Sequence, residues 1–83
     1  MQVTPNNRSK QTEVFIKTMR VVACRAADAC YNGQLTPRQS AAIFQELSDD
    51  MLNLAYAVRA GDPIPFPKIQ DSAAVKELLE ANK

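Results

Sequence analysis

Two long segments of the sequence have apolar residues at helical spacing, and only the four residues Gly33–Thr36 separate them. The spacing predicts one helix over residues 9–32 and another over residues 37–60. A connection this short joins helices that lie antiparallel and side by side. The sequence therefore predicts an all-α fold built on an antiparallel hairpin of two long helices.

Signals for helix ends support these boundaries. Gly33 suits the left-handed position that follows a helix, and Gly61 has the same place after the second segment. Thr36 is predicted to be the N-cap of the second helix. Pro37 fits the first helical position, and Gln39 completes a capping box with Thr36. The second helix thus has the clearest start signal in the chain.

Each predicted helix has one apolar stripe that we expect to face the core. In the first helix the stripe consists of Phe15, Met19, Val22, Ala26, Ala29 and Cys30. In the second helix it consists of Ile43, Phe44, Leu47, Met51, Leu54 and Val58.

The rest of the chain is assigned around this hairpin. Residues 1–8 are predicted to be a flexible arm, and residues 9–83 a single helical domain. Alternating prolines favour an extended path over residues 62–70, either as a lid on the hairpin or as a docking peptide. A short helix is expected over residues 72–81, capped by Asp71 or Ser72. The apolar residues expected to anchor the tail are Ile64, Phe66, Val75, Leu78 and Leu79.

The composition excludes the common catalytic chemistries. The chain has no histidine and only two glycines, so a serine or cysteine nucleophile lacks its usual base and no glycine-rich loop can hold phosphate. No C-x-x-C pair or other metal-ligand spacing is present. We therefore expect no enzyme, no metal and no cofactor.

The two cysteines are expected to be free thiols. Cys24 and Cys30 are six residues apart in one predicted helix, which separates them by about 9 Å along its axis. A disulfide requires Cα atoms within about 7 Å. Free thiols and the lack of a signal peptide favour the cytoplasm, and no apolar run approaches the roughly 20 residues that span a membrane.

Carboxylates gather on one side of the second predicted helix. An E-x-x-D spacing on a helix can contribute to a magnesium site, but such sites also need carboxylates from facing helices. The first helix offers only Glu13 and Asp28. We therefore expect a solvated acidic face that consists of Glu46, Asp49, Asp50 and Asn53.

Basic residues are concentrated in the first part of the chain, although the net charge is only +1. Residues 1–33 hold five basic and two acidic side chains, which gives +3. This bias is mild and falls short of the basic footprint that nucleic-acid binding usually leaves. Nucleic-acid binding by the basic arm and first helix is kept as the alternative function. The residues expected to bind it are Arg8, Lys10, Lys17 and Arg25.

The first predicted helix is apolar nearly all round, which is typical of a helix buried on more than one side. Outside its stripe it carries Val14, Ile16, Val21, Ala23, Cys24, Ala27 and Tyr31. Either a second copy of the chain or another protein covers these residues, or the tail wraps around them. Self-association, as a homodimer or larger, is the favoured alternative.

The leading functional hypothesis is a small protein-interaction module, an adaptor, regulator or inhibitor that docks a helical surface on a larger protein. Leu52 and Tyr56 are one turn apart on the side of the second helix away from its stripe, and such pairs are common interface anchors. The residues expected to contact the partner are Leu52, Tyr56, Val21, Lys17 and Arg20.

Overall fold

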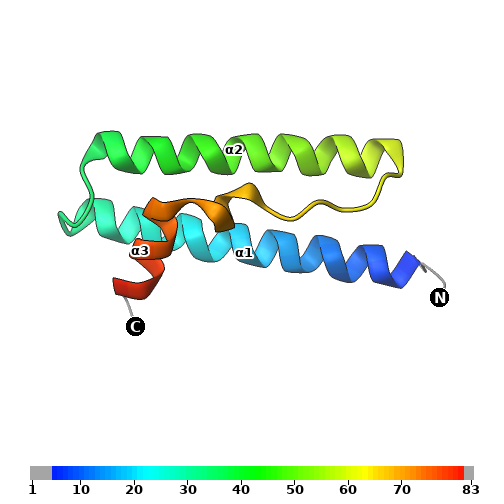
Figure 1. Ribbon diagram of the computed structural model, residues 1–83, viewed down its shortest axis with the longest axis horizontal. Helices are drawn as coiled ribbons and strands as arrows, with labels where there is room; N and C mark the ends of the chain where they lie inside the picture. The colour runs from blue at the N-terminus through cyan, green and yellow to red at the C-terminus, as the bar shows by residue number, and fades with distance from the viewer. Residues whose placement is uncertain (1–4, 82–83) are drawn as a thin grey trace.

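A computed structural model describes residues 5–81, with side-chain environments for residues 8–80. This part of the chain is all-helical and contains no strand, and its two long helices pack together (Figure 1). The predicted fold class is confirmed at this level. The elements are α1 (Pro5–Tyr31), α2 (Pro37–Ala60), the 3₁₀ helix η1 (Lys68–Asp71) and α3 (Ala73–Ala81).

The helices α1 and α2 run antiparallel, and the chain after α2 returns along the pair before α3 crosses α1 (Figure 1). Helix α3 packs on α1, and η1 packs on α2. The tail, residues 62–81, therefore covers one side of the hairpin. The buried core combines all three helices and η1, with Phe15, Met19, Val22, Ala26, Ala29, Ile43, Leu47, Leu54, Ile69, Val75 and Leu78.

Helix α1 begins at Pro5, four residues before its predicted start, so residues 5–8 are not part of an arm. A proline is favoured in the first turn of a helix, where its missing N–H costs no hydrogen bond. The Arg8 guanidinium also donates a hydrogen bond from Nη2 to the Ala57 carbonyl, at 3.4 Å, which joins this end of α1 to α2. The first four residues of the predicted arm lie outside the described part.

The predicted ends of the hairpin connection are confirmed. The Thr36 N–H donates to Oε1 of Gln39 at 2.9 Å, and the Gln39 N–H donates to Oγ1 of Thr36 at 3.1 Å. These two bonds form the capping box. Gly33 and Gly61 have φ of 83° and 74°, the left-handed conformation that glycine adopts without steric cost.

Replacing Thr36 by alanine is expected to lower the free energy of unfolding by about 1 kcal/mol, because the Gln39 N–H then loses its acceptor. Replacing Thr36 by serine keeps the hydroxyl and is the matched control. Urea denaturation followed by circular dichroism measures both. Equal losses for the alanine and serine variants would contradict the role of the hydroxyl.

The tail departs from the prediction at residues 68–71, which form η1 and not an extended path. Asp50 is the cause. Its carboxylate accepts hydrogen bonds from the N–H groups of Lys68 and Ile69, both at 2.9 Å, and thereby caps the start of η1. Asp50 is only 2% exposed, so its assignment to a solvated acidic face is wrong. Its neighbours Glu46, Asp49 and Asn53 are exposed as predicted.

The apolar anchor of the tail is Ile69, which is 0% exposed, and not Phe66, which is 88% exposed. Ile64 is partly buried against the core, and Pro67 is buried. In a polyproline-type path with three residues per turn, positions 64 and 67 face the same side and position 66 does not. The prediction that both Ile64 and Phe66 anchor this segment is therefore confirmed for Ile64 and wrong for Phe66.

The apolar stripe of α2 is wider than the surface that the rest of the chain covers. Ile43, Leu47 and Leu54 are buried as predicted. Phe44, Met51 and Val58 are exposed, although they belong to the same predicted stripe. They lie toward one edge of the stripe. They remain exposed because one antiparallel partner and a tail on a single side cannot cover a broad apolar face.

Candidate functional site

An open apolar groove lies between α1 and α2. All of its lining residues come from these two helices, and it encloses about 330 Å³. We call it the hairpin groove. It is lined by Ile16, Met19, Arg20, Ala23, Phe44, Leu47, Ser48 and Met51.

The hairpin groove faces away from the tail. Asp50, adjacent to Met51 in the chain, turns its carboxylate to the backbone of η1, which places the tail on one side of α2. Successive residues of a helix differ by about 100°, so Met51 projects in another direction. Met51 is 45% exposed and stands at the groove. The groove is therefore the side of the hairpin that the tail leaves open.

The groove has a buried apolar base, and its lining carries little charge. Met19 and Leu47 are buried at its base, where they also belong to the core. Arg20 is the single charged residue of its lining. Phe44, Met51 and Val58 are spaced by seven residues, two helical turns, so the exposed apolar stripe of α2 continues beyond the groove toward Ala60. Exposed apolar patches of this kind mark interaction surfaces in monomeric proteins.

Leu52 and Tyr56 form a second apolar surface, which we call the outer α2 patch. Both side chains are more than half exposed, at 51% and 59%. They lie on the side of α2 opposite its buried residues, as their spacing predicted. The outer α2 patch and the hairpin groove are thus separate sides of one helix.

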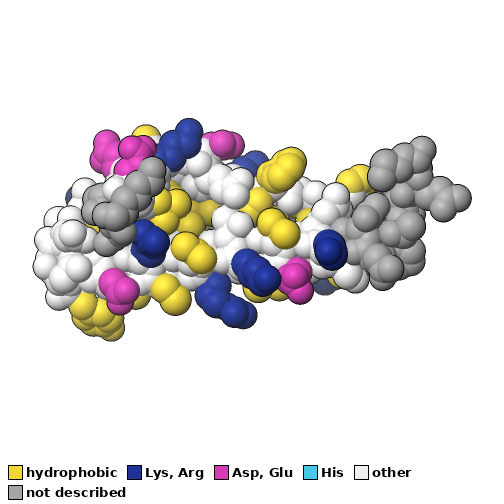
Figure 2. All heavy atoms as spheres, turned by 90° about the horizontal axis from the view of Figure 1, so that it is seen from below, with side chains coloured by type: hydrophobic (Ala, Val, Ile, Leu, Met, Phe, Trp, Pro, Cys, Tyr) yellow, Lys and Arg dark blue, Asp and Glu magenta, His cyan; other side chains and the backbone are white. Residues whose placement is uncertain are grey.

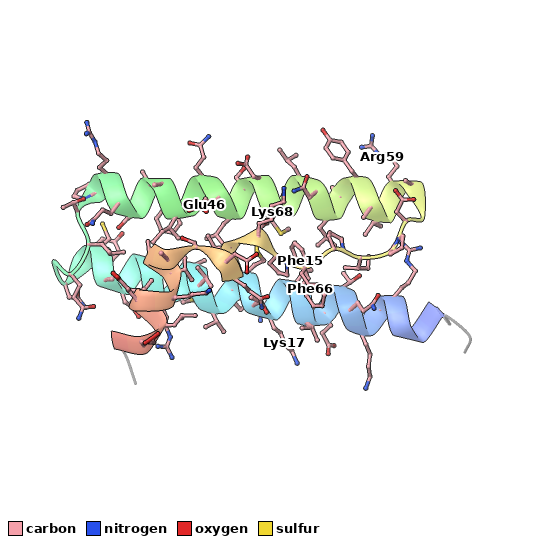
Figure 3. The ribbon with its side chains drawn as sticks, viewed as in Figure 1. Phe15, Lys17, Glu46, Arg59, Phe66 and Lys68 are labelled. Atoms are coloured by element: carbon pink, nitrogen blue, oxygen red, sulfur yellow. The ribbon has the colours of Figure 1, made fainter. Side chains whose placement is uncertain are left out.

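The other residues expected to contact a partner do not join the outer α2 patch. Arg20 lines the hairpin groove. Val21 and Lys17 line a shallow hollow with Leu79 of α3. Lys17 lies 3.6 Å from Glu13 in an exposed ion pair and points away from α2 (Figure 3). The five residues predicted as one contact set are therefore distributed over three surfaces.

The basic residues proposed for nucleic-acid binding also face different directions. Lys10 and Lys17 are exposed and two helical turns apart on one side of α1. Arg25 is half-buried, and Arg8 is turned toward α2 by its bond to Ala57. On the lower side of the molecule, basic, acidic and hydrophobic side chains are interspersed (Figure 2). This part of the surface is not a continuous basic stripe.

A smaller hollow lies where α1 meets the proline segment, and it is lined in part by Phe15, Val14 and residues 64–67. Phe15 and Phe66 lie near each other at this place (Figure 3). Phe15 belongs to the core, whereas Phe66 is exposed. The hollow is thus an edge of the tail-covered side and not a continuation of the hairpin groove.

Cys24 is exposed and Cys30 half-buried, and both are free thiols. Within residues 5–81 no group of three or more histidine, cysteine, aspartate or glutamate side chains could hold a metal ion. None of the described helices combines the length and the hydropathy needed to cross a bilayer.

These features define a small all-α protein built on a helical hairpin with two exposed apolar surfaces. Comparison with protein-family models, curated proteins and solved structures finds no match to this chain. Function is therefore inferred from the surfaces themselves. Sequence reasoning identified Leu52 and Tyr56 but missed the hairpin groove, because it assigned Phe44, Met51 and Val58 to the core.

Proposed function

We propose that the chain is a non-catalytic protein-interaction module, an adaptor, regulator or inhibitor that docks a helical surface on a larger protein. The observation that supports this most directly is the exposure of large apolar side chains on two separate sides of α2. Apolar surface in water is costly, and its burial is the main driving force of protein association. The two free thiols suit a reducing compartment such as the cytoplasm.

The outer α2 patch is the surface that we assign to the larger partner. Tyrosine has a large, rigid apolar ring and a hydroxyl that can bond at the edge of an interface. Asp49 lies one turn before Leu52 and Arg59 one turn after Tyr56, and both are exposed. An apolar centre with a polar rim is the usual organisation of a docking surface.

Replacing Leu52 or Tyr56 by alanine is expected to weaken partner binding by about 30-fold, the loss typical of a central interface residue. Glu46→Ala, an exposed change on the same helix, is the matched control and should bind like the wild type. Affinity capture identifies the partner, and titration calorimetry with the purified partner measures the dissociation constants. Wild-type affinity in both Leu52 and Tyr56 variants would exclude this surface.

Nucleic-acid binding by Arg8, Lys10, Lys17 and Arg25 has weaker support. A phosphate backbone is recognised by several cations that face it together. Arg8 is engaged with Ala57, and Arg25 is half-buried. The protein-interaction module is therefore the function that the surfaces favour.

A further inference from the structure

We propose that the hairpin groove is the interface of a twofold-symmetric homodimer, in which two hairpins pack face to face as a four-helix bundle. The proposal does not depend on docking of a larger protein, because it concerns a different side of α2. It commits to a second copy of this chain as the occupant of the groove.

The shape of the molecule is suited to this assembly. Its extents are 46 × 24 × 17 Å, so it is a thin layer in which the tail covers one face. These extents belong to the whole chain, so the open face measures at most 46 by 24 Å, about 1,100 Å². A stable interface buries about 800 Å² on each partner, which this face can supply if most of it is covered. Two such layers complete the usual arrangement of a four-helix bundle.

The exposed stripe of α2 is symmetric about its central residue. Phe44 and Val58 are each seven residues, two turns, from Met51. A twofold axis through Met51, perpendicular to the helices, brings the two Met51 side chains together. It also packs Phe44 of each copy near Val58 of the other. An isologous interface requires this self-complementarity, and a surface for an unrelated protein does not.

The same axis passes through Ile16 of α1. The groove spans residues 16–23 of α1 and 44–51 of α2. Because the two helices are antiparallel, Ile16 lies at the level of Met51 and Ala23 at the level of Phe44. The axis at Met51 therefore brings Ile16 of the two copies together, and the small side chain of Ala23 leaves room for α1 of the other copy on either side of the centre.

Charge at the rim of the groove is also self-complementary. Glu13 lies three residues before Ile16 and Arg20 four residues after it, so both flank Ile16 on the helix surface. When α1 of one copy runs antiparallel to α1 of the other about Ile16, Glu13 of each copy faces Arg20 of the other. The ion pair of Glu13 with Lys17 is exposed and therefore weak enough to be exchanged or shared. Two reciprocal ion pairs then close the edge of the interface.

Solution mass tests the dimer. We expect purified full-length protein to have twice its 9.2 kDa chain mass in size exclusion with light scattering, from about 1 to 200 µM. Met51→Glu places two carboxylates against each other at the axis and should raise the dimer dissociation constant by at least about 100-fold. Leu52→Glu adds the same charge to the neighbouring residue, which has similar exposure, and should leave the mass unchanged.

A charge exchange tests the register. Glu13→Arg and Arg20→Glu, each alone, place like charges opposite each other and should weaken the dimer about fivefold. The double variant restores opposite charges and should recover most of the wild-type dissociation constant. Circular dichroism of each variant confirms that its helices are intact.

Three outcomes would overturn the proposal. The first is a wild-type monomer over the whole concentration range, which would leave the groove to a different protein. The second is an equal loss of mass in the Met51→Glu and Leu52→Glu variants. The third is a double charge variant no better than either single one, which would exclude the antiparallel register of α1.

Discussion

Replacing Asp50 by alanine is expected to lower the free energy of unfolding by about 3 kcal/mol. The Asp50 carboxylate accepts hydrogen bonds from the Lys68 and Ile69 N–H groups, and Ile69 is completely buried. Hydrogen bonds to a charged acceptor are the stronger kind. Alanine removes both acceptors at once and leaves the N–H of Ile69 in the core without a partner.

Asp49→Ala is the matched control, because Asp49 is the adjacent residue and its side chain is exposed. It should change the free energy of unfolding by less than about 0.5 kcal/mol. Urea denaturation of both variants at one protein concentration measures the difference, since stability depends on concentration if the chain associates. Equal stabilities would show that the cap on η1 does not hold the tail.

Replacing Ile69 by alanine is expected to cost about 3 to 4 kcal/mol, the usual range for truncating a fully buried isoleucine. Ile69 is 0% exposed and lies in the core with Phe15, Val75 and Leu78. Truncation removes apolar contacts and leaves a cavity that the three helices can only partly close. Chemical denaturation followed by circular dichroism gives the value.

Phe66→Ala provides the control for this change. Phe66 lies in the same tail and has a larger side chain, yet it is almost fully exposed. Its truncation should cost less than about 0.5 kcal/mol. A loss at Phe66 as large as the loss at Ile69 would contradict the way the tail is seated on the hairpin.

These two residues also explain why the hairpin has one open side. Asp50 and Ile69 hold η1 against α2, and α3 then packs on α1. The tail therefore packs on the face of the hairpin opposite the hairpin groove. The apolar residues that it does not cover, above all Phe44 and Met51, are the ones available to a second copy.

The prediction of the tail shows where sequence reasoning was limited. The helix of residues 72–81 was found within one residue of α3 at its start, and Ser72 accepts a hydrogen bond from the Val75 N–H at 3.5 Å. The placement of the segment before it was wrong at Phe66. Proline spacing predicts a backbone type, but not which side chain of that backbone meets the core.

Of the two exposed surfaces of α2, only the outer α2 patch was predicted, for a related reason. Leu52 and Tyr56 were expected to be exposed, because they lie opposite a strong stripe, and they are. Phe44 and Met51 were assigned to the core on the same pattern. Periodicity identifies the apolar side of a helix but does not say how much of that side the rest of the chain can cover.

The sequence by itself determined the elements of this protein. The capping box of Thr36 and Gln39, the two left-handed glycines and the seven-residue stripes act over one or two helical turns, so neighbouring residues suffice to predict them. Only the tertiary structure decided that Asp50 is buried and on which side of the hairpin the groove lies. Asp50 meets partners 18 and 19 residues away, and a carboxylate that would otherwise face water becomes a buried cap. The groove exists because the tail packs on the other face of the hairpin, a choice between two apolar sides that depends on the fit of the whole chain.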